Sequence, residues 1–322
     1  RMRALLARLQ NPQERFRSLI VGGTNGKGTV ASLLAALLQA DGHQVGLYTS
    51  PHLHTQRERI RVGSEVLHKD RWAEAVAHLD DCTRDFAAEG LGPFSKFEAL
   101  TGLAAWFFAQ QRVEFGIFEA GLGGRYDAAN AWDSELAILT SVGLDHMEFL
   151  GDTIAEIAAD KLDIIRPGRT LVTSAAQDSE VVALARRTCA ERQVELQMVE
   201  GDWTLSALAG RPATYGQNAG LALEAAETLC GKFATERVAE VVENHRWPGR
   251  FETAQNEPLV LLDGAHNPAS AAALADDLRQ QGRDWVVVVG AATGHDAEGI
   301  VRALVPLASR FVLTSSEHPR AV

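Results

Sequence analysis

The 322-residue chain contains little cysteine, and its three cysteines form no recognisable pair. Cys82, Cys189 and Cys230 are far apart in the sequence, and none belongs to a C-x-x-C motif. A disulfide framework uses an even number of cysteines, and a zinc site uses closely spaced ligands, so this set argues against both. We therefore expect reduced cysteines in a cytoplasmic protein.

The chain also lacks long apolar runs and blocks of like charge. No apolar stretch approaches the roughly 20 residues that a membrane helix needs, and the first residues lack the apolar core of a secretory signal. Lys and Arg number 31 against 42 Asp and Glu, a net charge of −11 without a basic stripe. We therefore expect neither a membrane nor a nucleic-acid partner. Because the sequence starts without Met and ends abruptly, we expect residues to be missing at both ends.

Short apolar runs alternate with helical patterns along most of the chain. Residues 96–111 carry apolar side chains at helical spacing, whereas the run WVVVV at 285–289 shows no alternation. Such runs are typical of strands buried on both faces of a parallel sheet, so the pattern indicates an α/β protein. The predicted strands are residues 19–21, 45–48, 114–118, 136–140, 170–172, 259–262, 285–289 and 311–314.

The length of the chain suggests two domains. Pro248 and Gly249 interrupt a helical stretch, and a new strand, turn and helix pattern begins at Leu259. We therefore predict a large N-terminal domain over residues 1–250 and a smaller α/β domain over 251–322, which we expect to be incomplete.

The segment GGTNGKGT at residues 22–29 lies between a predicted strand and a helical pattern over 32–40. Its glycines allow backbone N–H groups to approach an anion, and the helix N-terminus and Lys27 add positive charge. Thr29 offers a hydroxyl to a phosphate-bound magnesium ion. The usual phosphate loop is G-x-x-x-x-G-K-[ST], but here Gly28 separates Lys27 from Thr29. A glycine turn without a ligand is the simpler alternative, and the presence of both Lys27 and Thr29 favours phosphate.

Two further predicted strands are followed by polar side chains. Glu119 follows one strand and Asp145-His146 the other, and the carboxyl ends of parallel strands face the crevice where α/β proteins bind ligands. A buried carboxylate needs a cation nearby, which could be a metal ion or the side chain of Arg125. His146 could equally be a structural histidine.

These segments resemble, in the same order, the motifs of the folylpolyglutamate synthase/dihydrofolate synthase family of the Mur ligase superfamily. The loop has the family's Lys-Gly-Thr form, and Arg320-Ala321 resemble the Arg-Ala that follows its later motifs. Asp160, which replaces the usual Glu, Thr214-Tyr215 and Gly294-His295 depart from its pattern. The resemblance implies a P-loop N-terminal domain with a mostly parallel sheet and a smaller Rossmann-like C-terminal domain. The matching segments are NPQERF (11–16), TSPH (49–52), EAGLGGRYDAAN (119–130), DHMEFLG (145–151), IAEIAADKLDIIRPG (154–168), WPGRFE (247–252) and DGAHNP (263–268).

The resemblance also implies a role for each candidate residue. It makes Lys27, His146, Lys161 and Arg250 catalytic, and it implies two Mg²⁺ ions. Other interpretations stay open for Lys161 as an ion-paired lysine and for Asn218 as a helix cap. The ATP-binding residues would be Thr24, Asn25, Gly26, Lys27, Gly28, Thr29, Asn218, Arg250, Asp263 and His266. The metal ligands would be Thr29, Ser50, Glu119, His146 and Lys161 as a carbamate. The substrate contacts would be Arg59, Phe97 and Asp127, although Arg59 could shape its own loop and Phe97 could belong to the core.

The implied activity is ATP-dependent addition of L-glutamate to dihydropteroate, or to the γ-carboxylate of folates, through an acyl phosphate. Its partners would be these small molecules, and we expect a monomer. Two alternatives stay open. A UDP-muramyl ligase would carry an N-terminal UDP-binding domain, whereas residues 1–21 alone precede this loop. A P-loop binding module without ligase activity would not consume glutamate.

Overall fold

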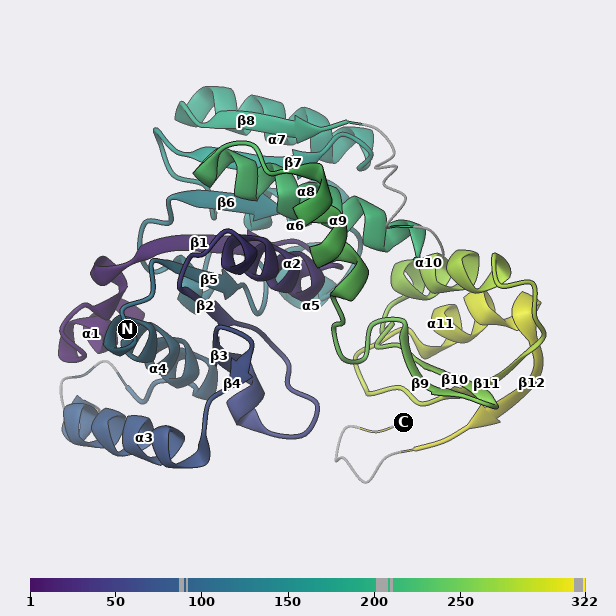
Figure 1. Ribbon diagram of the computed structural model, residues 1–322, viewed down its shortest axis with the longest axis horizontal. Helices are drawn as coiled ribbons and strands as arrows, with labels where there is room; N and C mark the ends of the chain where they lie inside the picture. The colour runs from purple at the N-terminus through teal and green to yellow at the C-terminus, as the bar shows by residue number, and fades with distance from the viewer. Residues whose placement is uncertain (87–89, 91, 201–207, 209–210, 316–320, 322) are drawn as a thin grey trace.

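The structure is a computed structural model that describes residues 1–86, 90, 92–200, 208, 211–315 and 321. An eight-stranded sheet in the order β4-β3-β2-β5-β1-β6-β7-β8 forms the centre of the larger part (Figure 1). The six strands from β2 to β8 in this order pair in parallel, and β3 and β4 add an antiparallel edge. The strands are β1 (Arg17–Gly22), β2 (Val45–Tyr48), β3 (Ile60–Val62), β4 (Glu65–Val66), β5 (Phe115–Glu119), β6 (Leu136–Leu139), β7 (Thr170–Ser174) and β8 (Glu195–Val199).

Helices cover both faces of this sheet, and strand β1 shows how its apolar run serves both. Leu19 and Val21 pack in the cluster under α2, α8 and α9, while Ile20 packs on the opposite side under α1, α4 and α7. An apolar run without alternation is therefore what a strand between two helical layers requires. The helices are α1 (Met2–Arg8), α2 (Lys27–Ala40), α3 (Lys69–Thr83), α4 (Lys96–Gln110), α5 (Met147–Leu150), α6 (Ile154–Leu162), α7 (Ser179–Arg192), α8 (Ala213–Cys230) and α9 (Thr235–Asn244).

A smaller domain follows, at the right of Figure 1. A hairpin of β9 (Glu252–Asn256) and β10 (Leu259–Leu262) leads to α10 (Pro268–Arg279). Next, β11 (Trp285–Val289) pairs in parallel with β12 (Ala308–Leu313), with α11 (Ala297–Leu304) between them. The α/β class with a second, smaller domain is thus confirmed.

The prediction of a strand buried on both faces is wrong for β11. Val287 and Val289 pack against α10 and α11, whereas Val286 and Val288 are 58% and 66% exposed. The helices of this domain pack on one face of the β11–β12 pair, so alternate valines face away from them. Helix α2 also begins earlier than predicted, at Lys27, because the glycines of the loop enter its first turn.

Two further expectations bear on cellular context. Cys82, Cys189 and Cys230 are all free thiols. None of the helices that the structure describes is both long and apolar enough to cross a membrane. The predicted match at Arg320 lies outside the described residues.

Candidate active site

The phosphate-loop candidate runs from the end of β1 into the first turn of α2. Gly23 and Gly26 have φ angles of +137° and +87°, which glycine adopts without strain. A Cβ on Gly26 would lie 2.5 Å from Oδ1 of Asn218, so the loop also needs glycine to pass close to α8. Lys27 Nζ donates to the carbonyl oxygens of Gly23 (3.1 Å) and Thr24 (3.0 Å), which holds its charge over the loop.

The additional glycine of the loop, Gly28, lies against two side chains from distant parts of the chain. A Cβ at this position would be 3.1 Å from Nε1 of Trp247 and 3.5 Å from both carboxylate oxygens of Glu119. The spacing that departs from the usual phosphate loop therefore allows a carboxylate to contact the first turn of α2.

Glu119 is the last residue of β5 and is only 5% exposed. Its Oε2 accepts a hydrogen bond of 2.8 Å from the backbone N–H of Ser50. Burial raises the pKa of this carboxyl, and the charge of Lys27 opposes the shift. The predicted alternative of an ion pair with Arg125 is wrong, because Arg125 pairs with Asp163 (3.6 Å) and is largely exposed. Since a carboxylate has about four lone-pair positions, Glu119 retains acceptor capacity for a cation.

Lys161, in α6, is 4% exposed and reaches the same loop from the opposite side. Its Nζ donates to the carbonyl oxygen of Gly23 (2.9 Å), which Lys27 also contacts. Burial lowers the pKa of Lys161 to about 7, and the neighbouring charge of Lys27 acts in the same direction. The amine is therefore substantially neutral near neutral pH.

The glycine turn after Glu119 packs directly on the helix that carries Lys161. Asp160, which stands where the family has Glu, accepts a hydrogen bond from the N–H of Gly124 (2.8 Å). A Cβ on Gly124 would lie 2.7 Å from the carbonyl oxygen of Lys161, so only glycine allows this approach. The shorter Asp side chain thus still anchors the turn.

His146 begins α5 in a left-handed conformation, and its side chain is 40% exposed. Its Nε2 lies 3.9 Å from Oδ1 of Asp145. No hydrogen bond or ion pair within the described part of the chain joins His146 to Ser50 or Glu119. Burial would raise the pKa of Asp145, but the nearby His266 side chain, the charge of His146 and the hydrogen bond from Asn267 hold it well below its usual range.

Asn267 joins the smaller domain to the glycine loop, a contact that was not predicted from the sequence. Its side-chain amide donates to Asn25 Oδ1 (3.1 Å) and Asp145 Oδ2 (3.1 Å), and His266 Nε2 lies 3.6 Å from the same Asp145 oxygen. Asn267 is 3% exposed and also caps α10 through Ser270. Its position in DGAHNP gives no signal for this contact, because the sequence does not show which domain faces Asn267.

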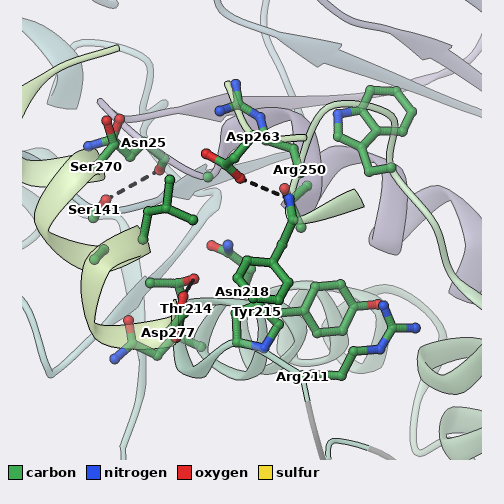
Figure 2. A pocket seen from close by; sticks show the side chains of 18 of the residues that line it. Asn25, Ser141, Arg211, Thr214, Tyr215, Asn218, Arg250, Asp263, Ser270 and Asp277 are labelled. Carbon is green, nitrogen blue, oxygen red and sulfur yellow. Dashed lines mark hydrogen bonds between the residues drawn. The ribbon is translucent and has the colours of Figure 1, made fainter. Parts of the chain in front are cut away.

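A cavity of about 940 Å³ lies between the two domains, which is within the usual range for small-molecule sites (Figure 2). Figure 2 shows Asn218 and Tyr215 on α8 facing Arg250 and Asp263 from the smaller domain's side. Asn218 lies inside α8 (Ala213–Cys230), so the helix-cap interpretation is wrong. Of the predicted site residues, the cavity is lined by Asn25, Gly26, Thr29, Asn218, Arg250 and Asp263.

Sequence reasoning missed the aromatic side of this cavity. Tyr215 was seen only as a departure from the family's pattern, and Arg211 was not singled out. The guanidinium of Arg211 lies 4.7 Å above the Tyr215 ring, and both line the cavity. Flat aromatic and guanidinium groups of this kind suit a planar ligand, but a single Tyr in a sequence carries no such signal.

The predicted substrate residues lie around the turn that follows Glu119. Asp127 is buried and accepts hydrogen bonds from three backbone N–H groups, two of them in this turn. The Phe97 ring covers Gly121, where a Cβ would lie 2.6 Å from the ring, and it also packs against the core. Arg59 donates to Nδ1 of His52 (2.9 Å). Asp127 and Phe97 thus shape the turn, whatever else they contact.

Comparisons with known proteins agree with this geometry. A family model described as "Mur ligase, glutamate ligase domain" matches residues 249–322. The chain is 31% identical to the dihydrofolate synthase/folylpolyglutamate synthase of Bacillus subtilis, over all of this chain and 81% of that protein.

Solved structures extend the similarity to the whole fold. Mycobacterium tuberculosis folylpolyglutamate synthase complexed with ADP matches with a TM-score of 0.93 and 28% identity, over 100% of this chain and 79% of that chain. E. coli FolC in complex with DHPP and ADP matches with a TM-score of 0.85 and 25% identity, over 99% and 79%.

The two-domain fold, the phosphate loop and the C-terminal match together define an ATP-dependent ligase of the Mur type. Within that class, the chain belongs to the dihydrofolate synthase/folylpolyglutamate synthase family.

Proposed function

We propose that this chain joins L-glutamate to dihydropteroate, to the γ-carboxylate of a folate such as tetrahydrofolate, or to both. A carboxylate oxygen of the acceptor attacks the γ-phosphorus of ATP, so that ADP leaves and an acyl phosphate forms. The amine of glutamate then attacks the acyl carbon, phosphate leaves, and a proton is lost from the new amide nitrogen. Both acceptors are considered because the Bacillus subtilis relative is named for two activities, dihydrofolate synthase and folylpolyglutamate synthase.

The observation that carries this proposal is the contact of Glu119 with the first turn of α2 at Gly28, beside the half-buried Lys27. In our assignment, Lys27 and the loop amides from Thr24 to Thr29 hold the β- and γ-phosphates. No side chain acts as a nucleophile, so positioning and electrostatic stabilisation account for the rate.

Two Mg²⁺ ions fit the donors at this site, and we assign them to Thr29, Ser50, Glu119 and His146. The buried Glu119 carboxylate receives only the Ser50 N–H among the described residues, which leaves oxygen lone pairs for a hard cation. The imidazole of His146 is the softest of these donors, and its side chain is 40% exposed. When bound, magnesium neutralises charge on the transferring phosphate oxygens.

We assign Lys161 as a carbamate in the active enzyme. Carbon dioxide adds to a neutral amine, so that the nitrogen loses a proton and a cation becomes a carboxylate. A pKa of about 7 makes that neutral amine available near neutral pH. The change would replace the repulsion between Lys161 and Lys27 by attraction and supply a further oxygen ligand for metal.

We further propose a domain boundary at residues 250 and 251, with Arg250, Asp263 and His266 closing over the nucleotide. Arg250 and Asp263 line the cavity opposite Asn218, and such a seam brings positive charge to the γ-phosphate on closure. We expect a monomer, and the three free thiols support a cytoplasmic location.

ADP release tests the proposal directly, with dihydropteroate or tetrahydrofolate as acceptor and with glutamate present or omitted. We expect release that requires both an acceptor and glutamate. A preference for a UDP-muramyl acceptor, or release without any acceptor, would instead favour the two alternative functions.

Variants assign the activity to the site. Lys27→Ala is expected to abolish ligation, whereas Lys232→Ala, an exposed lysine paired with Glu227, should leave it unchanged. Near-wild-type ADP release by Lys27→Ala would overturn the assignment of the loop.

A further inference from the structure

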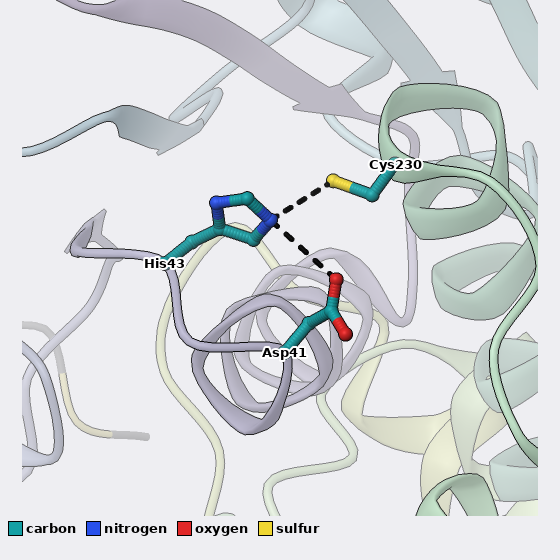
Figure 3. Close-up of side chains that lie close together, drawn as sticks. All are labelled: Asp41, His43 and Cys230. Atoms are coloured by element: carbon teal, nitrogen blue, oxygen red, sulfur yellow. Dashed lines mark hydrogen bonds and ion pairs between the residues drawn. The ribbon is translucent and has the colours of Figure 1, made fainter.

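Three potential metal ligands meet at the end of α2 that lies away from the phosphate loop (Figure 3). Asp41 caps the C-terminus of α2, His43 lies just before β2, and Cys230 is the last residue of α8. Since α2 has 14 residues, this cluster lies about 20 Å along the helix from the loop. Nothing in the proposed ligase mechanism uses these residues.

The spacing of the three donor atoms suits one tetrahedral ion. His43 Nε2 lies 3.3 Å from Cys230 Sγ and 3.6 Å from Asp41 Oδ2, and all three atoms are within 4.8 Å of one another. Zinc bond lengths at a tetrahedral angle place N and S about 3.6 Å apart and N and O about 3.4 Å apart. The two observed distances from His43 Nε2 lie within about 0.3 Å of these values, and the Asp41 and Cys230 ligand atoms lie within 4.8 Å of each other.

A fourth side chain orients the histidine for this role. Glu114 Oε2 lies 2.7 Å from Nδ1 of His43 and favours the tautomer in which Nδ1–H donates a hydrogen bond to it. The lone pair of Nε2 then faces Cys230 and Asp41. A carboxylate behind a ligating histidine is a common arrangement in zinc sites, where it fixes the ring and increases its basicity.

The charges around the cluster also suit a cation. The C-terminal ends of α2 and α8 both point their carbonyl groups toward it, and helix C-termini carry partial negative charge. Arg237 pairs with Oδ1 of Asp41 and leaves Oδ2 facing His43. Arg17, the other nearby cation, forms a two-point ion pair with Glu135.

A Cys, a His and a carboxylate also make up the triad of a thiol nucleophile, but the surroundings disfavour that role. Burial raises the pKa of the Cys230 thiol, the charge of Arg17 opposes the shift, and Asp41 and Glu114 reinforce it. Activated thiols instead lie at helix N-termini or beside unpaired cations. Among the described residues, this is the only group of three such side chains with ligand atoms this close together.

We propose that Asp41, His43 and Cys230 bind a zinc ion, with a fourth position open to solvent. Binding displaces the thiol proton, so Cys–SH and Zn²⁺ give Cys–S–Zn⁺ and H⁺. The ion ties the C-terminal ends of α2 and α8. These two helices carry the phosphate loop and Asn218, so the ion would act as a remote brace for the nucleotide site.

Cadmium is the probe, because thiolate binding to cadmium gives an ultraviolet charge-transfer band that magnesium sites do not. The protein is first freed of zinc and then titrated with CdCl₂ in the presence of excess Mg²⁺ and ADP. In a second experiment, the thermal unfolding of the zinc-free protein is measured with and without ZnCl₂. We expect one equivalent of cadmium to produce the band and added zinc to abolish it by displacing cadmium. Zinc at 100 times its Kd should raise Tm by about 5 °C.

Matched variants identify the ligands. Cys230→Ser should lose the band, and His43→Asn should weaken cadmium binding at least tenfold, with the metal-free Tm of each showing that it folds. Glu114→Gln should keep the band but bind about tenfold more weakly. Cys82→Ser is the control, since Cys82 also contacts a histidine, His78 at 3.5 Å.

Three outcomes would overturn the proposal. The first is a band that persists in Cys230→Ser, and the second is a band that disappears in Cys82→Ser. The third is a wild-type protein that shows neither a band nor a zinc-dependent shift in Tm at neutral pH.

Discussion

Replacing Gly28 by Ala tests why this phosphate loop carries an extra glycine. Gly28 is in the first turn of α2, and its φ is not positive, so the backbone accepts alanine. The added Cβ would nevertheless lie 3.1 Å from Trp247 Nε1 and 3.5 Å from both Glu119 oxygens. The first distance is closer than ordinary packing, so Trp247 must move by a few tenths of an ångström.

The effects on stability and on catalysis should separate. Alanine in place of glycine stabilises a helix by about 1 kcal/mol, whereas overpacking costs about 1–3 kcal/mol, so the net destabilisation should be about 0–2 kcal/mol. If Trp247 and Glu119 lie beside the phosphates as proposed, their displacement should lower kcat/KM at least about tenfold, equivalent to about 1.4 kcal/mol.

Urea unfolding and steady-state ADP release measure the two effects. Gly102→Ala is the matched control, because Gly102 is also helical and its Cβ would lie 3.2 Å from Leu9, far from the loop. That variant should alter stability to a similar extent and leave kcat/KM unchanged.

Trp247→Phe removes Nε1 and with it the close contact to the new Cβ. The double variant Gly28→Ala/Trp247→Phe should therefore lose less kcat/KM than the sum of the two single losses, by at least about 0.5 kcal/mol. Wild-type kcat/KM in Gly28→Ala, or strict additivity in the double variant, would refute the reasoning.

Three other perturbations follow from buried polar groups. Lys161 has a folded pKa of about 7, below its ordinary 10.5, so its burial destabilises the fold fully below pH 7 and less as pH rises. Lys161→Met removes this buried charge, so it should be more stable than the wild type at pH 6, and the difference in unfolding free energy should shrink by about 2–3 kcal/mol by pH 9. Urea unfolding without bicarbonate measures this difference, and a value that does not change with pH would contradict the reasoning. His245 bonds to Ser32 (2.8 Å) and Tyr215 (3.0 Å), and burial lowers its pKa to about 4 from 6.5. The unfolding free energy of the wild type should thus fall by about 3 kcal/mol as pH falls from 6.5 to 4. His245→Phe should cost about 1–3 kcal/mol at pH 7 but should reduce this dependence on pH. An unchanged dependence on pH would assign the acid sensitivity to other groups. Asn267→Ala should cost about 1 kcal/mol through its lost cap and weaken ADP binding about five- to tenfold in calorimetry, and unchanged affinity would show that the bridge to the loop is dispensable.

The sequence predicted the apolar strands, including β10, β11 and β12 of the smaller domain, better than the short or polar ones. Strands β1, β2, β5, β6 and β7 were all anticipated, because an apolar run between turns is a local signal. Strands β3 and β4 are three and two residues long, and β8 and β9 are half-exposed or polar. Their pairing depends on a neighbouring strand, which no local pattern encodes.

The candidate site shows the same division. Local pattern was sufficient to propose Lys27 and Glu119, because each stands beside a glycine turn at the end of a predicted strand, whereas Lys161 was proposed from the family resemblance alone. The spacing of the cysteines argued against a zinc site, yet Cys230 lies 3.3 Å from a histidine 187 residues earlier in the chain. Ligands this far apart in sequence leave no spacing pattern.

By itself, the sequence determined an α/β chain with a glycine-rich phosphate loop and carboxylate, imidazole and amine groups at the ends of strands and helices. The tertiary structure alone decided which of these groups meet. It brought Trp247 and Glu119 against Gly28, Asn267 against Asn25, and both lysines to the carbonyl of Gly23. The physical reason is that glycine spacing and apolar periodicity act over a few residues. Contacts between side chains a hundred or more residues apart arise only when helices pack on a sheet and a second domain closes on its edge.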